Sequence, residues 1–369
     1  MTRIALMGPA NSIHLQRWAQ ALAERGHEIC VLSQHEVKPG KLPTVSEIVE
    51  LPYHGQTGYF LNALYVKKAL KYWMPDILNA HYASGYGTTA ALCGIRPLLL
   101  SVWGSDVYDF PYENVIKRRL IEFNLHKATA IASTSHAMAR QVCRLISNAN
   151  QILITPFGID AKRFFPRPEC RELNYITVGI VKTLAPKYGI DLLLHAFAGL
   201  LTDSRINALP QTCRLFIVGD GPQRRELEAL AGALGVANQT YFAGAVPHAE
   251  VPDWLNRFDI YCAPSRLDSE SFGVAVIEAG ACGLPVVVSD VGGLPEVVLN
   301  GETGLVVPRE NVERLQHALT TLVLDATMRK NLGQRGCEHV GSVYDWQHCI
   351  DIMEDAYTTT INMHHKTKS

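Results

Sequence analysis

Two glutamates, Glu270 and Glu278, stand eight positions apart around the string Ser271-Phe272-Gly273-Val274. The apolar pattern over residues 273–282 predicts a helix that begins within this string. Free backbone N–H groups at the start of a helix bind phosphate oxygens, and Gly273 lets a ligand approach the backbone closely. Because the two carboxylates can accept hydrogen bonds from hydroxyls, the segment suits a nucleotide sugar. Spacing alone leaves another interpretation open, in which Glu278 is solvated and Glu270 only interacts with the helix dipole.

Two lysines, Lys182 and Lys187, lie five positions apart in a loop after the predicted buried strand Tyr175–Val181. Their ammonium groups can flank a diphosphate, and each contact at about 4 Å is worth roughly 4 kcal/mol before desolvation at an effective dielectric constant of about 20. A leaving nucleotide gains negative charge, so this stabilisation would act mainly on the transition state. The alternative is a pair of solvated loop lysines.

Other small and polar residues follow further predicted strands. Asp106, in Trp103-Gly104-Ser105-Asp106, follows strand 98–102 and is a candidate acceptor-side base or sugar contact, or else a helix cap. His81 has the same ambiguity. The turn after strand 214–218 contains Gly219 and Gly221, and the loop after strand 3–7 contains Gly8, Asn11, Ser12 and His14.

Residues 265–308, which begin SRLDSESFGVAVIEAGACGLP, resemble the E-x7-E block of the retaining glycosyltransferases of family 4. Residues 175–197 are similar to the G-R-L-x3-K-G pattern of that family. Lys182 stands where arginine is usual, so the bidentate guanidinium fork is lost. Residues 156–160 with Phe164 are similar to a structural motif that follows the family's linker. The resemblance extends through most of the chain.

The resemblance implies a role for each matching position. Glu270 would contact the transferred sugar, Glu278 would hold the ribose, and residues 245–248 would lie near the base. Lys187 and Lys182, with Asp106, would complete the catalytic set. The diphosphate would meet the backbone of Phe272, Gly273 and Val274. The donor pocket would be lined by Gly219 and Gly221. The acceptor would be bound by Gly8, Asn11, Ser12 and His14, although His14 has the alternative of packing locally.

Strands alternate with helices along the whole chain, which predicts parallel sheets covered on both faces. Residues 155–174 contain three prolines and little periodicity, so they are expected to link two domains. We expect an α/β protein of two facing Rossmann-like domains with a cleft between them, the GT-B architecture. The predicted parts are an acceptor-side domain over 1–165, a donor-binding domain over 166–340, and a helix over 341–369 that crosses back and ends in a disordered tail.

Composition narrows the class of protein. The formal net charge of −1, from 34 basic and 35 acidic residues, argues against nucleic-acid binding. The nine cysteines form no CxxC pair, which favours a reducing cytoplasm over a disulfide or zinc framework. Without a signal-peptide core or an apolar run long enough to span a bilayer, we expect a cytoplasmic protein, at most peripheral at the inner face of the cell membrane.

The helix near 60–73 carries Lys67, Lys68 and Lys71, either for docking on anionic lipid or as a solvated face.

We expect a retaining hexosyltransferase that moves a sugar from a UDP- or GDP-sugar to a saccharide or lipid-linked acceptor, in surface polysaccharide or glycoconjugate synthesis. No Asp-x-Asp follows an early strand, so metal-independent catalysis without a cofactor is expected, and retention follows from the resemblance alone. A dehydrogenase would need a GxGxxG that neither sheet has, and a phosphorylase a lysine for pyridoxal phosphate. The open alternatives are a nucleotide-sugar epimerase and a non-catalytic sugar-nucleotide-binding protein.

Overall fold

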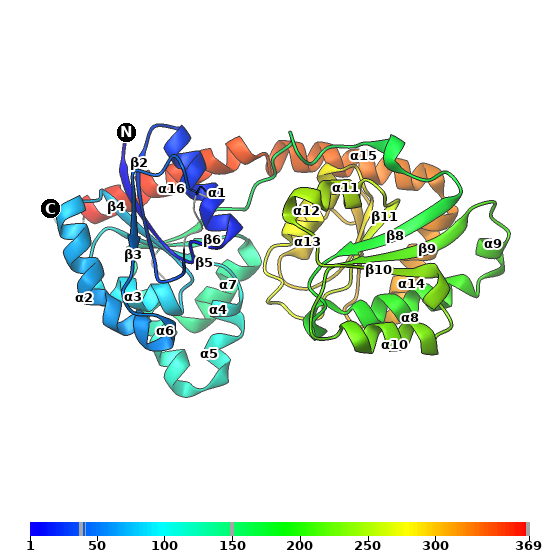
Figure 1. Cartoon of the computed structure of the whole chain (residues 1–369), viewed down its shortest axis with the longest axis horizontal. Coiled ribbons are helices and arrows are strands. Elements are labelled where there is room, and N and C mark those ends of the chain that lie inside the picture. The colour runs from blue at the N-terminus through cyan, green and yellow to red at the C-terminus, as the bar shows by residue number, and fades with distance from the viewer. Residues whose placement is uncertain (37–39, 41, 148–150, 367–369) are drawn as a thin grey trace. The chain divides into compact units, whose positions relative to one another are not determined.

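The computed structural model describes residues 1–36, 40, 42–147 and 151–366. The chain divides into two compact units (Figure 1). One unit consists of Met1–Pro156 together with Gln347–Ser369, and the other of Phe157–Trp346. The first unit is therefore built from both ends of the chain.

The described part of the first unit holds a seven-stranded parallel sheet in the order β3-β2-β1-β4-β5-β6-β7. Its central strands are buried along almost their whole length, because helices cover both faces. The strands are β1 (Arg3–Met7), β2 (Glu28–Ser33), β3 (Glu47–Glu50), β4 (Ile77–His81), β5 (Leu98–Val102), β6 (Ala130–Ser133) and β7 (Ile152–Ile154). The helices are α1 (Ile13–Glu24), α2 (Gly55–Trp73), α3 (Gly85–Cys93), α4 (Ser105–Tyr108), α5 (Phe110–Glu113), α6 (Val115–Lys127), α7 (His136–Leu145) and α16 (Trp346–Lys366).

The helix α16 returns to the first unit and bonds to residues of its beginning. Tyr357 donates a hydrogen bond from its hydroxyl to Oδ1 of the buried Asn79 on β4, at 3.0 Å. Glu354 accepts from Arg25 at 2.8 Å and lies 2.7 Å from Nε2 of His27. These contacts make the helix an integral part of the first unit.

The second unit repeats the same topology. Its six-stranded parallel sheet has the order β10-β9-β8-β11-β12-β13, and both sheets thus follow the Rossmann order 3-2-1-4-5-6, with one further strand in the first. Its strands are β8 (Tyr175–Val181), β9 (Thr212–Val218), β10 (Thr240–Gly244), β11 (Ile260–Ala263), β12 (Val286–Ser289) and β13 (Gly304–Val307). Its helices are η1 (Pro168–Cys170), η2 (Pro186–Tyr188), α8 (Ile190–Leu201), α9 (Ser204–Asn207), α10 (Arg224–Ala233), η3 (Ala237–Gln239), η4 (His248–Glu250), α11 (Val251–Leu255), α12 (Val274–Ala281), α13 (Leu294–Val297), α14 (Val312–Leu324) and α15 (Ala326–Val343).

The expected fold class, two Rossmann-like α/β domains, is confirmed. In such sheets the strand order reverses at a switch point, and ligands bind at the carboxyl ends of the strands there. In the first unit this point lies between β1 and β4, and in the second between β8 and β11. The loops that leave these four strands are therefore where a ligand site is expected.

One expectation about the end of the chain was wrong. The tail HHKTKS was expected to be disordered, but α16 continues through His364, His365 and Lys366. The buried Thr360 keeps the last turns of the helix against the unit, and basic side chains at a helix C-terminus interact favourably with its dipole. Residues 367–369 lie outside the described part.

Candidate active site

Lys182 and Glu270 form an ion pair at the switch point of the second sheet. Lys182 is the first residue after β8, and Glu270 lies in the loop that joins β11 to α12. Nζ lies 2.8 Å from Oε1, and the two side chains are only 18% and 10% exposed. Burial lowers the pKa of Lys182, but Glu270, Tyr188 and Glu278 together raise it above its ordinary value. The lysine therefore carries its charge in a partly dehydrated place.

Lys187 meets Lys182 at a common aromatic ring. Their Nζ atoms lie 4.9 and 4.5 Å from the ring centroid of Tyr188, within the range of cation–π contacts. Among the described residues Lys187 forms no ion pair within 4.0 Å, whereas Lys182 has Glu270. The site thus holds two ammonium groups and one paired carboxylate, which leaves the charge of Lys187 for an anion.

Arg266 holds the Lys187 loop in place. Its backbone N–H donates to the carbonyl oxygen of Lys187 at 2.8 Å, and its guanidinium makes two bonds to Asp191, of 2.8 and 2.6 Å. The same guanidinium donates to the carbonyl oxygen of Pro186 at 3.1 Å. Bidentate pairing of this kind fixes both distance and orientation. The sequence analysis did not single out Arg266, because its partner lies 75 residues away.

Glu278 lies on α12 with a side chain only 6% exposed, and its Oε1 is 2.9 Å from Nε2 of His248. The interpretation of Glu278 as a solvated helix residue is therefore wrong. His248 belongs to η4, so the structure brings the 245–248 stretch next to Glu278. Glu278 and Glu270 both raise the pKa of the fully buried Tyr261, after the larger effect of burial. The charges of both carboxylates therefore act on Tyr261 of β11.

A glycine pair fixes the loop that carries Glu270. Gly293 donates from its backbone to the carbonyl oxygen of Glu270 at 3.1 Å, and Gly292 donates to Oδ1 of Asp268 at 3.0 Å. A Cβ atom on Gly292 would lie 2.2 Å from the carbonyl oxygen of Glu270, and one on Gly293 would lie 2.2 Å from that of Ser271. This close approach explains why two glycines stand here.

The remaining predicted donor residues lie around the same loops. Gly219 has a φ of 139°, and a Cβ atom there would lie 1.9 Å from the carbonyl oxygen of Lys182, so a side chain would displace the lysine. Gly221 lies two residues on, and its N–H donates to the Asp220 side chain at 2.7 Å. Gly273 precedes Val274, the first residue of α12. The ring of Phe272 is buried against Phe157 and Tyr344, so only its backbone is available to a ligand.

The predicted acceptor residues lie on the first unit, after β1. Gly8 donates from its backbone to the carbonyl oxygen of Leu32 at 3.1 Å, Asn11 is exposed, and Ser12 occupies the N-cap of α1 without a side-chain cap bond. The ring of His14 contacts Trp103 edge-on, with 5.7 Å between centroids. Both interpretations of His14 therefore remain compatible with its position.

Asp106 is almost completely buried, and its carboxylate accepts backbone hydrogen bonds from Ala83 at 2.7 Å, Gly104 at 2.8 Å and Trp103 at 3.1 Å. Burial raises its pKa, and these bonds lower it by less. Both oxygens are thus engaged in joining the loop after β4 to the loop after β5. Asp106 is the second residue of α4, whose N-cap is Gly104, so these contacts join loops and are not those of an N-cap side chain.

His81 is fully buried at the end of β4, with its ring 5.2 Å from that of Trp103. Neither ring nitrogen has a hydrogen-bond partner among the described residues. Burial, with a smaller contribution from His14, lowers the pKa of His81 to about 3. The imidazole is therefore neutral at physiological pH.

Two protein-family models match this chain. Residues 162–339 match the family model described as glycosyl transferases group 1, and residues 3–135 match that described as glycosyl transferase 4-like. The chain belongs to the group 1 glycosyl transferases.

Two curated relatives are similar to part of this group 1 transferase. The phosphatidylinositol N-acetylglucosaminyltransferase gpi3 subunit of Schizosaccharomyces pombe is 27% identical over 75% of this chain and 60% of that protein. The GDP-mannose-dependent alpha-(1-6)-phosphatidylinositol monomannoside mannosyltransferase of Mycolicibacterium smegmatis is 33% identical over 52% of each chain. The chain thus spans between half and two thirds of the length of these relatives.

Solved structures show the same fold. The sucrose-phosphate synthase of Thermosynechococcus elongatus superposes with a TM-score of 0.81 at 21% identity, and the match covers 97% of this chain and 99% of that chain. The GT-B fold expected for a group 1 transferase is therefore confirmed.

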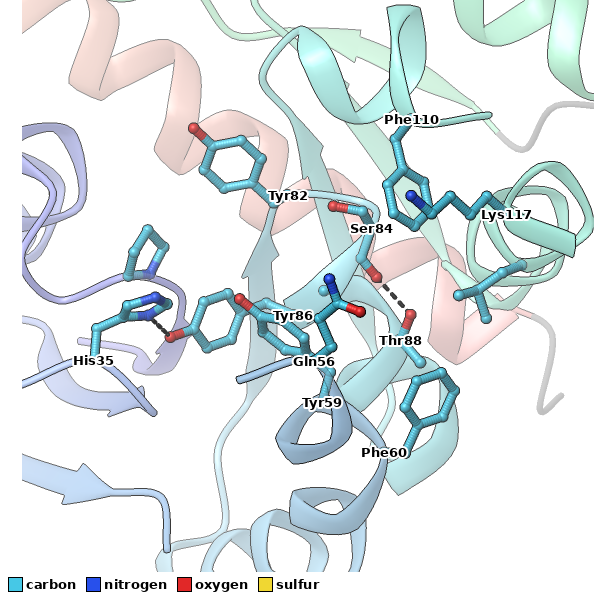
Figure 2. Close-up of a pocket in the computed structure, with 13 residues that line it drawn as sticks. His35, Gln56, Tyr59, Phe60, Tyr82, Ser84, Tyr86, Thr88, Phe110 and Lys117 are labelled. Atoms are coloured by element: carbon cyan, nitrogen blue, oxygen red, sulfur yellow. Dashed lines mark hydrogen bonds between the residues drawn. The ribbon is translucent and has the colours of Figure 1, made fainter. Parts of the chain in front are cut away.

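In this group 1 transferase, the described residues contain no helix that is long and apolar enough to cross a membrane. They also contain no group of three or more His, Cys, Asp or Glu side chains that could hold a metal ion. The sequence analysis missed a pocket of about 550 Å³ at the carboxyl edge of the first sheet, lined by His35, Tyr59 and Tyr86 among others (Figure 2). Tyr59 and Tyr86, in helices α2 and α3, could have indicated it only with knowledge of how those helices pack.

Proposed function

We propose that this chain transfers a sugar from a nucleotide sugar to an acceptor hydroxyl, with the donor bound on the second unit. The observation that carries the proposal is the Lys182–Glu270 ion pair at the switch point of the second sheet. A charged lysine and a carboxylate, both largely dehydrated, can bind a diphosphate and a sugar hydroxyl side by side.

The two lysines would act on the leaving group. Lys187 has no carboxylate partner among the described residues and can turn its full charge to the diphosphate. Lys182 is oriented by Glu270 and by the ring of Tyr188 before any ligand binds. Groups that are already in place cost no reorganisation when charge develops on the leaving nucleotide, so they lower the barrier.

The two glutamates would bind different parts of the donor. Oε1 of Glu270 is engaged by Lys182, and its second oxygen can accept a hydroxyl of the transferred sugar. Glu278, oriented by His248, would accept the ribose hydroxyls, with the base beside residues 245–248. A hydroxyl donating to a buried carboxylate makes a strong bond, which suits recognition of a polyhydroxylated ligand.

We further propose that transfer retains the anomeric configuration and needs no metal ion or cofactor. Retention rests on membership in a family whose E-x7-E members are retaining. Metal independence rests on the lysines, because two ammonium groups around a diphosphate supply the positive charge that Mg²⁺ supplies in other transferases.

For the acceptor we propose a lipid-linked saccharide, used in surface polysaccharide or glycoconjugate synthesis at the cytoplasmic face of a membrane. Two observations support it: both curated relatives described above are named for phosphatidylinositol glycolipids, and α2 exposes lysines beside apolar side chains.

The decisive experiment measures release of nucleoside diphosphate from UDP-glucose, UDP-N-acetylglucosamine and GDP-mannose, with and without a lipid extract as acceptor. A transferase releases UDP or GDP at a rate that rises with acceptor and yields a glycosylated product. An epimerase would convert the sugar without releasing nucleotide, and a binding protein would do neither. The assay is run with EDTA and with Mg²⁺, since loss of activity in EDTA and rescue by Mg²⁺ would contradict metal independence.

A further inference from the structure

The pocket of the first unit is lined by residues from several elements at the carboxyl edge of its sheet (Figure 2). The loops after β1, β2 and β4 contribute Pro9, His35 and Tyr82, and helices α2, α3, α5 and α6 supply the walls. Its volume of about 550 Å³ falls in the size range of ligand pockets in proteins. The switch point of the first sheet, between β1 and β4, is thus hollow.

Aromatic rings form a large part of the lining. Tyr59 and Tyr86 meet edge to face with 5.2 Å between centroids. Gly85 lets the ring of Tyr59 approach, because a Cβ atom there would lie 2.4 Å from its Cζ. Phe60 and Phe110 extend the apolar wall on the far side of the pocket from His35 (Figure 2). Such rings suit an apolar chain or the apolar face of a sugar.

One end of the pocket is polar and neutral. The Tyr86 hydroxyl lies 2.6 Å from Nδ1 of His35 and 3.1 Å from Oγ of Ser33, and the backbone N–H of Gln34 donates to it at 3.1 Å. Burial, with a contribution from His54, lowers the pKa of His35. Ser33 also accepts from the backbone of Ala10 at 3.1 Å, so this polar end is joined to the loop predicted to bind the acceptor.

Helices α2 and α6 also carry exposed apolar side chains. On α2, Phe60 and Leu64 are 51% and 79% exposed, and on α6, Val115 and Ile116 are 66% and 80% exposed. Lysines and arginines stand beside them: Lys67, Lys68 and Lys71 on α2, and Lys117, Arg118 and Arg119 on α6. Apolar side chains next to cations are typical of surfaces that contact anionic lipid.

We propose that this pocket binds the apolar chain of an amphiphilic acceptor. The chain lies against Phe60, Phe110 and Leu120, and the hydroxylated head reaches the neutral end at His35 and Tyr86. A water-soluble saccharide fits the polar end but leaves the larger apolar part of the lining unexplained. The name acceptor rests on the proposed function, whereas binding of an amphiphile by the pocket does not.

Calorimetric titration with n-octyl β-D-glucopyranoside, below its critical micelle concentration, tests the binding directly. Methyl β-D-glucopyranoside serves as the probe without a chain. We expect the octyl glycoside to bind at least about tenfold more tightly, because burial of apolar carbon supplies most of the difference. Equal affinity for the two glycosides, or tighter binding of maltotriose than of octyl glucoside, would overturn the proposal in favour of a saccharide pocket.

Two glutamate substitutions on the same helix provide a matched pair. Leu120→Glu places a carboxylate in the pocket, whereas Ile116→Glu adds the same charge to an 80% exposed position outside the lining. We expect Leu120→Glu to weaken octyl glucoside binding about tenfold or more, and Ile116→Glu to leave it unchanged within twofold. Equal binding by both variants would refute the assignment. If Leu120→Glu does not fold, Phe60→Asp and its control Leu64→Asp repeat the comparison on α2.

A second readout separates this inference from the proposed function. In the proposed function the donor is bound by the second unit, so Leu120→Glu should keep slow hydrolysis of the nucleotide sugar without acceptor while losing transfer to a long-chain glycolipid. If the wild-type chain neither hydrolyses the nucleotide sugar nor transfers its sugar, the proposed function fails. The octyl glucoside result still decides whether the pocket binds an amphiphile.

Discussion

Nζ of Lys182 and Oε1 of Glu270 lie 2.8 Å apart although 88 residues separate them in the chain. This ion pair joins the loop after β8 to the loop before α12, so the two strands at the switch point share one charged contact. A ligand that enters there meets a site whose charges are already oriented. The predictions below follow from this arrangement and from the loops around it.

Removing one partner of the Lys182–Glu270 pair should lower the free energy of unfolding more than replacing both charges with neutral side chains. Lys182→Met leaves Glu270 as an unpaired, largely buried carboxylate, and we expect a loss of about 3 kcal/mol in the free energy of unfolding. In the double variant with Glu270→Gln no charge is left unpaired, so its loss should be smaller than the sum of the two single losses. Urea unfolding of the four proteins measures the coupling, and strict additivity would show that the two side chains do not interact.

Lys187→Ala should lower kcat for sugar transfer by on the order of 100-fold, because an ammonium group that stabilises a leaving diphosphate acts mainly in the transition state. Lys187→Arg keeps the charge and should retain more activity than the alanine variant. Lys330→Ala removes an exposed lysine of α15 and is the control for charge. Steady-state kinetics with saturating acceptor measure all three, and a fully active Lys187→Ala protein would remove Lys187 from the site.

Glu278→Gln should raise the KM for the nucleotide sugar about tenfold and change kcat less, since a charge-assisted hydrogen bond to ribose is lost from ground state and transition state alike. His248→Ala should produce a smaller rise, because Glu278 keeps its charge and loses only its orienting partner. Initial rates over a range of donor concentrations give both constants. An unchanged KM in Glu278→Gln would mean that the carboxylate is structural.

Gly292→Ala should reduce both stability and activity, because its Cβ atom would lie 2.2 Å from the carbonyl oxygen of Glu270. Gly301→Ala is the matched control: its φ of 79° is also positive, but no atom lies within 4 Å of the added carbon. The control should lose only about 1 kcal/mol, the ordinary cost of a left-handed alanine. Equal thermal unfolding and equal activity of the two variants would contradict a crowded loop at Gly292.

His81 should make the protein less stable in acid. Its pKa is about 3 in the folded chain against 6.5 ordinarily, so the unfolded chain takes up a proton first as pH falls. The contribution of neutral His81 to the free energy of unfolding is therefore complete above pH 6.5. It is lost as the pH falls from 6.5 to about 3, at no more than about 1.4 kcal/mol per pH unit. The difference in unfolding free energy between wild type and His81→Leu should therefore change between pH 7 and pH 4. A difference that stays constant would contradict a buried, neutral His81.

The sequence was most informative where a strand is a plain apolar run. The bounds predicted for β1, β5 and β8 are those of the structure. Strand β4 was missed because Asn79 and His81 interrupt its apolar residues, and the partner that satisfies Asn79 is Tyr357, 278 residues away. Strand β3 was missed because it is a short edge strand with exposed glutamates at both ends.

The candidate site also contains residues that the sequence indicates and contacts that it does not. Local spacing indicated Glu270, Glu278, Lys182 and Lys187 as candidates, since each lies in a loop after a recognisable strand or in the helix that follows that loop. Their partners depend on tertiary packing, so neither the contact between His248 and Glu278 nor the ring of Tyr188 between two lysines could be read from the chain. The same is true of the aromatic pocket, whose walls come from helices that are distant in sequence.

The return of α16 to the first unit sets an order on synthesis at the ribosome. The second unit is one continuous segment, so all of its strands emerge before residue 347 is made. The first unit emerges earlier, yet Asn79, Arg25 and His27 gain their partners only when α16 follows. Domains generally fold as units in the order in which they emerge. Here the unit that begins the chain is the one that is completed last.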